Sequence, residues 1–293
     1  MAGFAVPASH PNSSHVRGVV LMLVSTACFT SNVLLVRALG EVESVNVWLM
    51  SCVRFCAGMG VILAVYRQGF QFTRLFTNAK LVSRGVIGGA GVYGFYLTVV
   101  ELGAGRATFI NNTYVIFGAL GAVWLLGERF RTTLAVGSVA ALAGLALLTN
   151  AFAAESHATV YDLVAVITAL ASAYVVITIR QLHATEHTST IFAAQCIYGI
   201  FICAIPALLH SQTVSTLAWS MMVLAGLFAA VGQITMTRAF RDLPVAEGSL
   251  LQMLVPLGIA IGGVVFFAEH FASHELVGAA LILGGTAVTA VRR

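Results

Sequence analysis

Continuous apolar runs of about 20 residues dominate the sequence, and they constrain the fold more than any other feature. Hydrophobic residues make up 59% of the 293 residues and charged residues only 9%, whereas charged residues are about a quarter of an ordinary soluble domain. A bilayer core about 30 Å thick requires about 20 apolar residues in each helix that crosses it. β-barrel strands would instead appear as short alternating segments. The sequence therefore predicts an all-α integral membrane protein.

Ten apolar runs end at charged or turn residues and are the expected transmembrane helices. They cover residues 18–38, 46–66, 85–104, 107–127, 132–150, 161–179, 190–209, 216–237, 245–267 and 275–291. These runs use most of the chain and leave no room for a soluble catalytic domain. The polar residues 1–17 lack the apolar centre of a cleavable signal, so we expect them to form a cytoplasmic N-terminal tail.

Lysine and arginine gather on one side of this arrangement. With the N-terminus placed in the cytoplasm, twelve of them lie inside and only Arg37 and Arg106 lie outside. Loops rich in lysine and arginine stay on the cytoplasmic side, so both termini are expected there. The long loop 67–84 contributes four of the twelve: Arg67, Arg74, Lys80 and Arg84. With its three phenylalanines, this loop is expected to lie on the inner leaflet as an amphipathic segment.

The second part of the chain repeats the first. A shift of 141 residues aligns residues 119–146 with residues 260–287, and 10 of these 28 positions are identical. The halves are therefore 18–150 and 161–291, with five helices each. Because five is odd, the second half must enter the membrane with the opposite polarity. Inverted repeats of this kind are a common plan of transporters, with the substrate site near the midplane between the halves.

The clearest motifs lie in residues 104–130 and 244–271. Each has a small-residue turn, an apolar helix and a closing glutamate, Glu128 or Glu269, and Pro256 stands thirteen residues before Glu269. The order and spacing of these motifs resemble the drug/metabolite transporter superfamily of the EamA type over essentially the whole chain. The resemblance implies ten helices, both termini in the cytoplasm of a bacterial cell, an inner-membrane location, and export of small metabolites.

Among the subfamilies, the chain most resembles the YddG-type amino-acid exporters. Those proteins carry aromatic side chains around a proline of the first half; here Tyr114 lies there and Val115 replaces the proline. Where their sixth helix often has a Trp-Ala pair, this chain has Ala171 and Ser172, with Tyr174 nearby. The resemblance implies export of amino acids, with aromatic and other neutral ones favoured, by alternating access. The alternative is an exporter of another small metabolite or a cationic drug.

Amide side chains in the middle of the expected spans are candidate substrate ligands. An unpaired amide in hydrocarbon costs a few kcal/mol, so these groups should face protein or water. Gln252 is the shifted partner of Asn111, which favours a symmetric site. Hydrogen bonds between helices, worth about 0.6 kcal/mol on average, are the alternative explanation. The candidates are Asn32, Asn111, Asn112, Gln195, Gln233 and Gln252.

Five tyrosines, Tyr174 among them, and one arginine complete the candidate site. Tyr93 and Tyr96 share one helix face and, like Tyr114, could line a cavity, whereas interfacial anchoring is the alternative for the first two. For Tyr198, packing is an equal alternative. An arginine within a span usually faces a cavity or a partner. For Arg54, a substrate carboxylate, an ion pair with Glu101 and snorkelling toward the outer headgroups all remain open.

The remaining chemistry-bearing residues do not indicate catalysis. All eight histidines lie outside the expected spans, no carboxylate lies at the centre of one, and the five cysteines fall in apolar runs without a CxxC motif. No phosphate-binding glycine motif occurs. We therefore expect no enzyme activity, no cofactor, no metal site and no nucleic-acid partner. The expected partners are a small-molecule substrate, an amino acid or related metabolite, and the lipid bilayer, with a monomer favoured.

Overall fold

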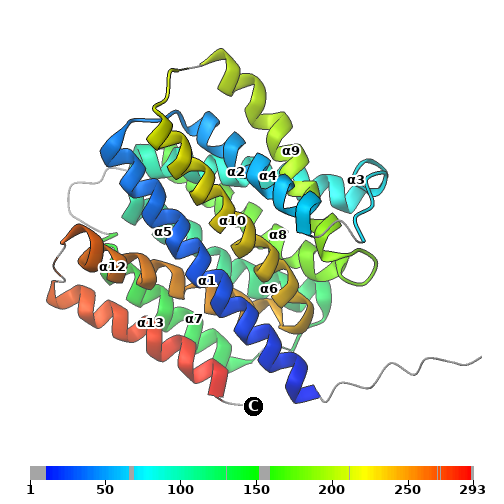
Figure 1. The fold of residues 1–293 in the computed structure, drawn as a ribbon. Helices are drawn as coiled ribbons and strands as arrows, with labels where there is room; N and C mark the ends of the chain where they lie inside the picture. The colour runs from blue at the N-terminus through cyan, green and yellow to red at the C-terminus, as the bar shows by residue number, and fades with distance from the viewer. Residues whose placement is uncertain are drawn as a thin grey trace, which may run out of the picture.

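A computed structural model describes residues 11–65, 69–129, 131–151, 159–210, 212–268, 270 and 272–291. The described residues form helices, turns and loops and contain no strand. By length and composition, eight helices could cross a membrane when each of two interrupted helices is counted as one, and α7 is a shorter apolar helix. The prediction of an all-helical, multi-pass membrane protein is therefore confirmed (Figure 1).

The helices follow the apolar runs of the sequence closely. The first part of the chain forms α1 (Pro11–Val42), α2 (Val47–Val65), α3 (Arg74–Thr77), α4 (Ala79–Leu102), α5 (Ala104–Asn112), α6 (Tyr114–Leu126) and α7 (Thr132–Leu148). The second part forms α8 (Val160–Leu182), α9 (Thr188–Leu209), α10 (Thr216–Asp242), α11 (Val245–Gln252), α12 (Leu254–Phe267) and α13 (Ser273–Val291). Of the two glutamates in the sequence motifs, Glu128 is described and Glu269 lies outside the described residues.

The start of α4 corrects one expectation. The side chain of Asn78 accepts a hydrogen bond from the Lys80 backbone N–H at 3.0 Å and caps the helix. Asparagine at this position satisfies one of the free N–H groups of the first turn. The helix consequently begins at Ala79, six residues before the expected boundary, and Arg84 belongs to α4 rather than to a loop.

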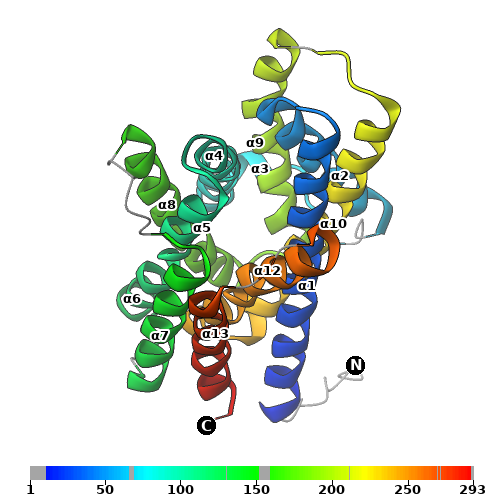
Figure 2. The same ribbon diagram turned by 90° about the vertical axis from the view of Figure 1, so that its left-hand side faces the viewer.

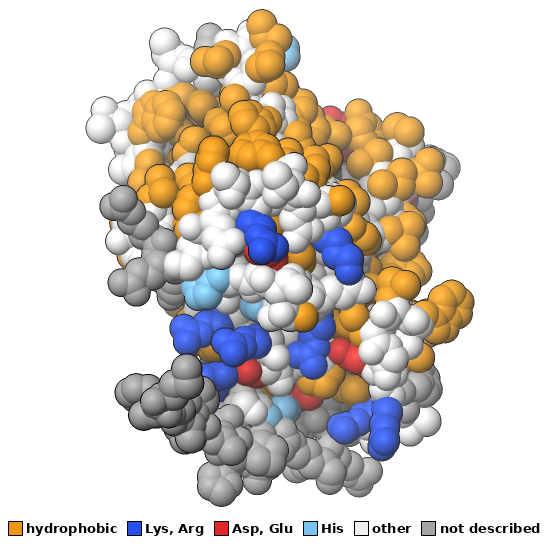
Figure 3. Space-filling view, turned by 90° about the vertical axis from the view of Figure 1, so that its right-hand side faces the viewer, with side chains coloured by type: hydrophobic (Ala, Val, Ile, Leu, Met, Phe, Trp, Pro, Cys, Tyr) orange, Lys and Arg blue, Asp and Glu red, His pale blue; other side chains and the backbone are white. Residues whose placement is uncertain are grey.

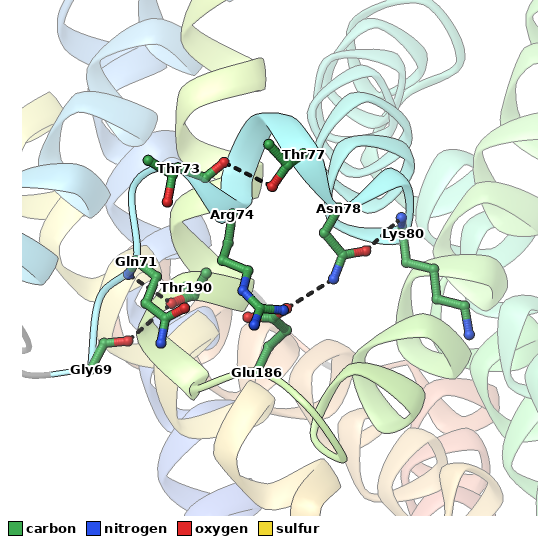
Figure 4. Close-up of polar contacts among 9 residues, drawn as sticks. All are labelled: Gly69, Gln71, Thr73, Arg74, Thr77, Asn78, Lys80, Glu186 and Thr190. Atoms are coloured by element: carbon green, nitrogen blue, oxygen red, sulfur yellow. Dashed lines mark hydrogen bonds and ion pairs between the residues drawn. The ribbon is translucent and has the colours of Figure 1, made fainter.

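The segment before α4 is held against the turn between α8 and α9 (Figure 4). Arg74 and Asn78 donate to the buried carboxylate of Glu186, at 3.2 and 2.8 Å. Phe72 and Phe76 are exposed beside it. Before α4, the expected amphipathic segment therefore contains a single helical turn, α3, and polar contacts fix its position.

Two helices are interrupted at equivalent points. Between α5 and α6, the hydroxyl of Thr113 donates to the carbonyl of Ile110 at 2.6 Å. Such side-chain bonds compete with the helical pattern and bend helices. Between α11 and α12, Pro256 has no N–H, and its ring conflicts with the carbonyl of Gln252, where α11 ends. The two breaks, at Thr113 and Met253, lie 140 residues apart.

Helices α7 and α13 pack closely through glycine along one edge of the bundle (Figures 1 and 2). A Cβ on Gly144 would lie 2.5 Å from the carbonyl oxygen of Gly278, and a Cβ on Gly278 would lie 2.5 Å from that of Gly144. A Cβ on Gly285 would lie 2.6 Å from the carbonyl oxygen of Gly137. Position 137 therefore meets 285 and 144 meets 278, so the two helices run antiparallel.

The contact between α2 and α9 has the same reciprocal form. A Cβ on Gly58 would meet the sulfur of Cys196 at 2.7 Å, and a Cβ on Gly199 would meet the ring of Phe55 at 2.5 Å. Gly199 is the 141-residue equivalent of Gly58, and Cys196 is that of Phe55. Each helix thus places an equivalent side chain on the other's glycine.

One end of the bundle holds the start of α1 and the end of α13 (Figure 2). On the face shown in Figure 3, lysine and arginine gather in the lower part and hydrophobic side chains cover the upper part. Ion pairs also join helices near the start of α1. Arg17 binds Asp242 at the end of α10 at 2.9 Å, and His15 binds Glu247 of α11 at 2.5 Å.

Candidate functional site

A cavity of about 290 Å³ lies between helices of the first and second parts of the chain. Every helix except α3, α7 and α13 contributes lining residues, and both interrupted helices form part of the wall. Most of the lining is apolar. Arg54 is the one charged residue among the described lining residues, and no aspartate or glutamate is among them.

The structure brings nine of the twelve candidate residues to this cavity. They are Asn32, Arg54, Tyr96, Asn111, Asn112, Tyr114, Gln195, Gln233 and Gln252. They come from eight different helices, and their side chains converge because the helices cross around one space. Their role in binding remains a prediction.

Arg54 faces the cavity rather than an acidic partner. Its Nη1 donates to the hydroxyl oxygen of Tyr96 at 2.9 Å. The guanidinium also lies 5.9 Å from the ring centroid of Phe29 and 5.8 Å from that of Tyr96, within the range of cation–π attraction. No ion pair joins Arg54 to Glu101, both of which the structure describes. Aromatic faces and one hydroxyl therefore position the cation and leave it without a carboxylate.

The amides differ in how firmly they are held. Asn32 donates to the Ala225 carbonyl at 2.9 Å. Gln252 donates to the hydroxyl oxygen of Ser25 at 3.0 Å, and Ser25 in turn donates to the Gly232 carbonyl at 2.8 Å. The side-chain amide of Gln233, in contrast, has no hydrogen-bond partner in the described part of the chain. Gln233 is therefore the amide with the most capacity for a ligand.

The first interrupted helix contributes three polar residues around its break. Asn112 donates to the Thr108 carbonyl of its own helix at 2.8 Å. The side-chain oxygen of Asn111 accepts a long hydrogen bond of 3.5 Å from Ser172. Tyr114, the first residue of α6, is almost fully buried against the cavity. The break thus turns successive polar residues toward the same space.

Three candidate tyrosines do not line the cavity. Tyr93 stacks on Trp48, with ring centroids 3.5 Å apart and planes 13° from parallel. The hydroxyl of Tyr174 shares a hydrogen bond of 2.6 Å with Ser83, and that of Tyr198 donates to the Leu75 carbonyl at 3.1 Å. Each therefore has a partner in the surrounding helices.

Sequence reasoning did not select several residues that line the cavity, including Phe29, Phe95, Met236 and Pro256. Apolar residues also face lipid or pack in the core, so residue type alone does not identify these as cavity-lining. Pro256 is the exception, because a proline inside an apolar run marks an interrupted helix. Ser172 and Thr108 also line the cavity, and their hydroxyl groups within apolar spans were the available signal.

A larger cavity of about 400 Å³ lies away from these candidates, between α6 and α7. Apolar residues line it, with Arg129, Arg131 and Arg180 beside Glu128. Glu128 accepts from the Val245 backbone N–H at 3.1 Å and lies 3.5 Å from Arg180. None of the twelve candidate residues lies there, whereas Asn112, Tyr114 and Gln252, which flank the two helix breaks, line the smaller cavity.

Metal and thiol chemistry have little support in the described residues. They contain no group of three or more histidine, cysteine, aspartate or glutamate side chains that could hold a metal ion. All five cysteines are free thiols, of which Cys196 and Cys203 are buried. The cavity therefore offers hydrogen bonding, aromatic contact and one positive charge, which are means of binding.

Comparison with known proteins agrees with a transport fold. The chain is 25% identical over 279 residues to proteins named pseudopaline exporter CntI from two strains of Pseudomonas aeruginosa, UCBPP-PA14 and PAO1, covering 90% of this chain and 93% of each relative. A solved crystal structure at 20% identity superposes with a TM-score of 0.80 over 92% of this chain and 95% of the other, which shows the shared fold. The sequence also matches the EamA-like transporter family over residues 16–150 and again over residues 159–291. The chain therefore belongs to the EamA-like transporter family and is a membrane transporter.

Proposed function

We propose that the chain exports small metabolites across a bacterial inner membrane by alternating access. The observation that carries this proposal is the cavity between helices of both parts of the chain, with two interrupted helices in its wall. Interrupted helices around a midplane cavity are typical of secondary transporters. The cavity volume of about 290 Å³ is close to the lower end of the usual range for small-molecule pockets, about 300–1,000 Å³.

The transporter is proposed to have ten membrane helices in two inverted halves, 18–150 and 161–291. The reciprocal glycine contacts support this arrangement. The 141-residue shift makes 137 equivalent to 278 and 144 equivalent to 285. Position 144 contacts 278, and position 137 contacts 285. Each contact is therefore the equivalent of itself with its two residues exchanged, as across a two-fold axis. The helices α7 and α13 are equivalent under the 141-residue shift and run antiparallel, which favours inversion. The two separate family matches support the same division.

The end of the bundle with the start of α1 is proposed to face the cytoplasm. The excess of lysine and arginine in the loops of this end supports that orientation, as does their position on the face in Figure 3. In this orientation, the contacts of Arg17 with Asp242 and of His15 with Glu247 join α1 to α10 and α11 at the cytoplasmic end. We propose that the transport cycle opens and reforms these contacts.

Amino acids and their derivatives are the proposed cargo, with aromatic and other neutral ones favoured. Apolar walls would accommodate the side chain, and the amides and Arg54 would bind the polar groups. Another small metabolite or a cationic drug is the second candidate. The similarity to proteins named pseudopaline exporters favours a metabolite within that alternative.

The test is transport by purified protein in lipid vesicles. Tyr114 begins α6 at the helix break and lines the cavity, so substitution by alanine should reduce transport of labelled amino acids without reducing membrane expression. Tyr93→Ala is the matched control, because Tyr93 packs on Trp48 outside the cavity and its loss should leave the substrate ranking unchanged. Equal transport by wild type and Tyr114→Ala at equal expression would refute the role of Tyr114.

A further inference from the structure

Arg84 is the most unusual charged residue of the described chain. It lies in α4 and has no exposed surface. Its Nη2 donates to the side-chain oxygen of Gln195 at 3.0 Å, whereas Nε and Nη1 have no hydrogen-bond partner among the described residues. A guanidinium keeps its charge at any physiological pH, and a buried charge without a partner costs several kcal/mol.

No described carboxylate compensates this charge. The carboxylates that form ion pairs bind other basic residues: Glu247 with His15, Asp242 with Arg17, Glu186 with Arg74, Asp162 with Arg106, and Glu128 with Arg180. Because Arg84 contacts none of them, the described protein does not supply its counter-charge. The missing negative charge is then expected to come from a ligand.

The guanidinium lies directly behind the cavity wall. A Cβ on Gly88 would lie 3.0 Å from Nη1 of Arg84. Gly88 lines the cavity, and so does Gln195, the hydrogen-bond partner of Arg84. Gln195 also donates to the Gly88 carbonyl at 3.3 Å. A glycine backbone and one amide side chain therefore separate the unpartnered nitrogen atoms from the cavity, and rotation of that amide would open a path between them.

Gln195 also adjoins the other arginine of the site. It lines a small cavity of about 10 Å³ together with Arg54. The 141-residue shift aligns Arg54 with Gln195, so the second half has an amide where the first half has a cation. Gln195 thus lies between two guanidinium groups, one on the cavity wall and one behind it.

We infer that the substrate is an organic anion bearing a carboxylate, and that Arg84 is a second cationic group that binds it after Gln195 moves. This inference rests on the proposed export of small metabolites, and it replaces the preference for neutral amino acids with one for acidic substrates. Two positive charges and no lining carboxylate attract anions and repel cations. The inference therefore favours acidic amino acids or acidic metabolites as cargo and opposes a cationic drug.

The test is uptake of labelled L-glutamate, L-phenylalanine and L-lysine into vesicles that contain the full chain. Wild type is expected to favour glutamate. Arg84→Gln should reduce glutamate uptake by about tenfold or more, the usual effect of removing one partner of a buried charge pair, while phenylalanine uptake changes much less. Arg84→Lys should retain part of the glutamate uptake. Arg74→Gln, at an exposed arginine paired with Glu186, is the matched control and should preserve the ranking.

Thermal unfolding of the purified protein without ligand provides the second measurement. If a ligand supplies the counter-charge, Arg84→Met should raise the unfolding temperature, because an apolar side chain replaces an uncompensated buried charge. A lower temperature would show a structural role and overturn the inference. Uptake of phenylalanine without glutamate by wild type would overturn it and leave the proposed function intact. Uptake of none of the three solutes would overturn amino acids as the proposed cargo, and the inference with it.

Discussion

The helices of the two parts of the chain meet in two contrasting ways. Along α7 and α13, backbones touch through glycine, and Cβ atoms added at Gly144 or Gly278 would lie 2.5 Å from a carbonyl oxygen. Around the central cavity, the same two parts leave about 290 Å³ open, and the mostly apolar lining includes several polar side chains. The α7–α13 contact has no space for a side chain larger than glycine, whereas the helices around the cavity leave open space and unsatisfied hydrogen-bonding groups. From this contrast we expect α7 and α13 to form a fixed seam, and we expect the cavity-lining helices to bind substrate and to move.

The largest expected effect is on the seam. Gly144→Ala places a Cβ 2.5 Å from the Gly278 carbonyl oxygen, and because both atoms are held by backbone, the helices must separate. Overpacking of this kind costs about 1–3 kcal/mol, so the unfolding temperature should fall by several degrees in thermal unfolding. Gly284→Ala is the matched control, since nothing lies within 4 Å of its added Cβ. Equal unfolding temperatures for the two variants would contradict the fixed seam.

The seam and the cavity also differ in how far the sequence could predict them. The spans were predicted closely because lipid selects directly for apolar side chains; α2, for example, covers Val47–Val65 against an expected 46–66. The 141-residue identities included Gly137, Gly144, Gly278 and Gly285, which form the seam. Which helix would meet which was not predictable, because a glycine stripe does not specify its partner.

The cavity was predictable in part. Amides in mid-span reach it because hydrocarbon excludes them, and this reasoning selected Gln233 and Gln252. It failed to separate Tyr96, which lines the cavity, from Tyr93, which stacks on Trp48. A tyrosine is apolar over its ring and polar at one atom, so packing and cavity lining give the same sequence pattern.

The sequence alone places Arg84 in the loop 67–84, because Arg84 follows Lys80 in a basic segment. The residue that could have placed it in a helix was Asn78, a favourable N-cap immediately before Ala79. Similarly, Pro256 could have predicted the break at Met253, whereas the break at Thr113 depends on side-chain hydrogen bonds that many intact helices also contain.

The second prediction tests the cavity side of the comparison. Gln233→Ala should weaken the apparent substrate affinity by about three- to tenfold, the usual worth of one neutral hydrogen bond, and leave thermal unfolding unchanged, because its amide has no protein partner in the described residues. Gln252→Ala should affect both measurements, since Gln252 also binds Ser25. Vesicle uptake and unfolding of both variants provide the measurement. Loss of stability in Gln233→Ala without loss of affinity would assign Gln233 to the structure alone.

The smallest expected effect concerns pH and the end of α8, beside the cavity-lining helices. His183 follows α8, and its Nε2 donates to the Thr237 carbonyl of α10 at 2.6 Å. Burial lowers the pKa of His183 below its usual 6.5, and the charges of Arg241 and Arg180 lower it further. The hydrogen bond to Thr237 and the charge of Asp242 raise the pKa, but they do not cancel this shift. The folded protein therefore binds this proton more weakly than the unfolded chain does.

Stability from the neutral form of His183 is present above the unfolded-state pKa and decreases as the pH falls through the folded-state pKa, with a slope of at most about 1.4 kcal/mol per pH unit. After correction for the slower intrinsic exchange in acid, protection against hydrogen exchange should fall at the end of α8 and in the adjoining part of α10 as the pH is lowered from neutral to about 5, more than at the α7–α13 seam. His183→Gln retains a donor for the Thr237 carbonyl without the titration, so it should remove this difference. If acid loosened α7 and α13 as much as α8 and α10 in wild type, the distinction between a fixed seam and a mobile cavity wall would be lost.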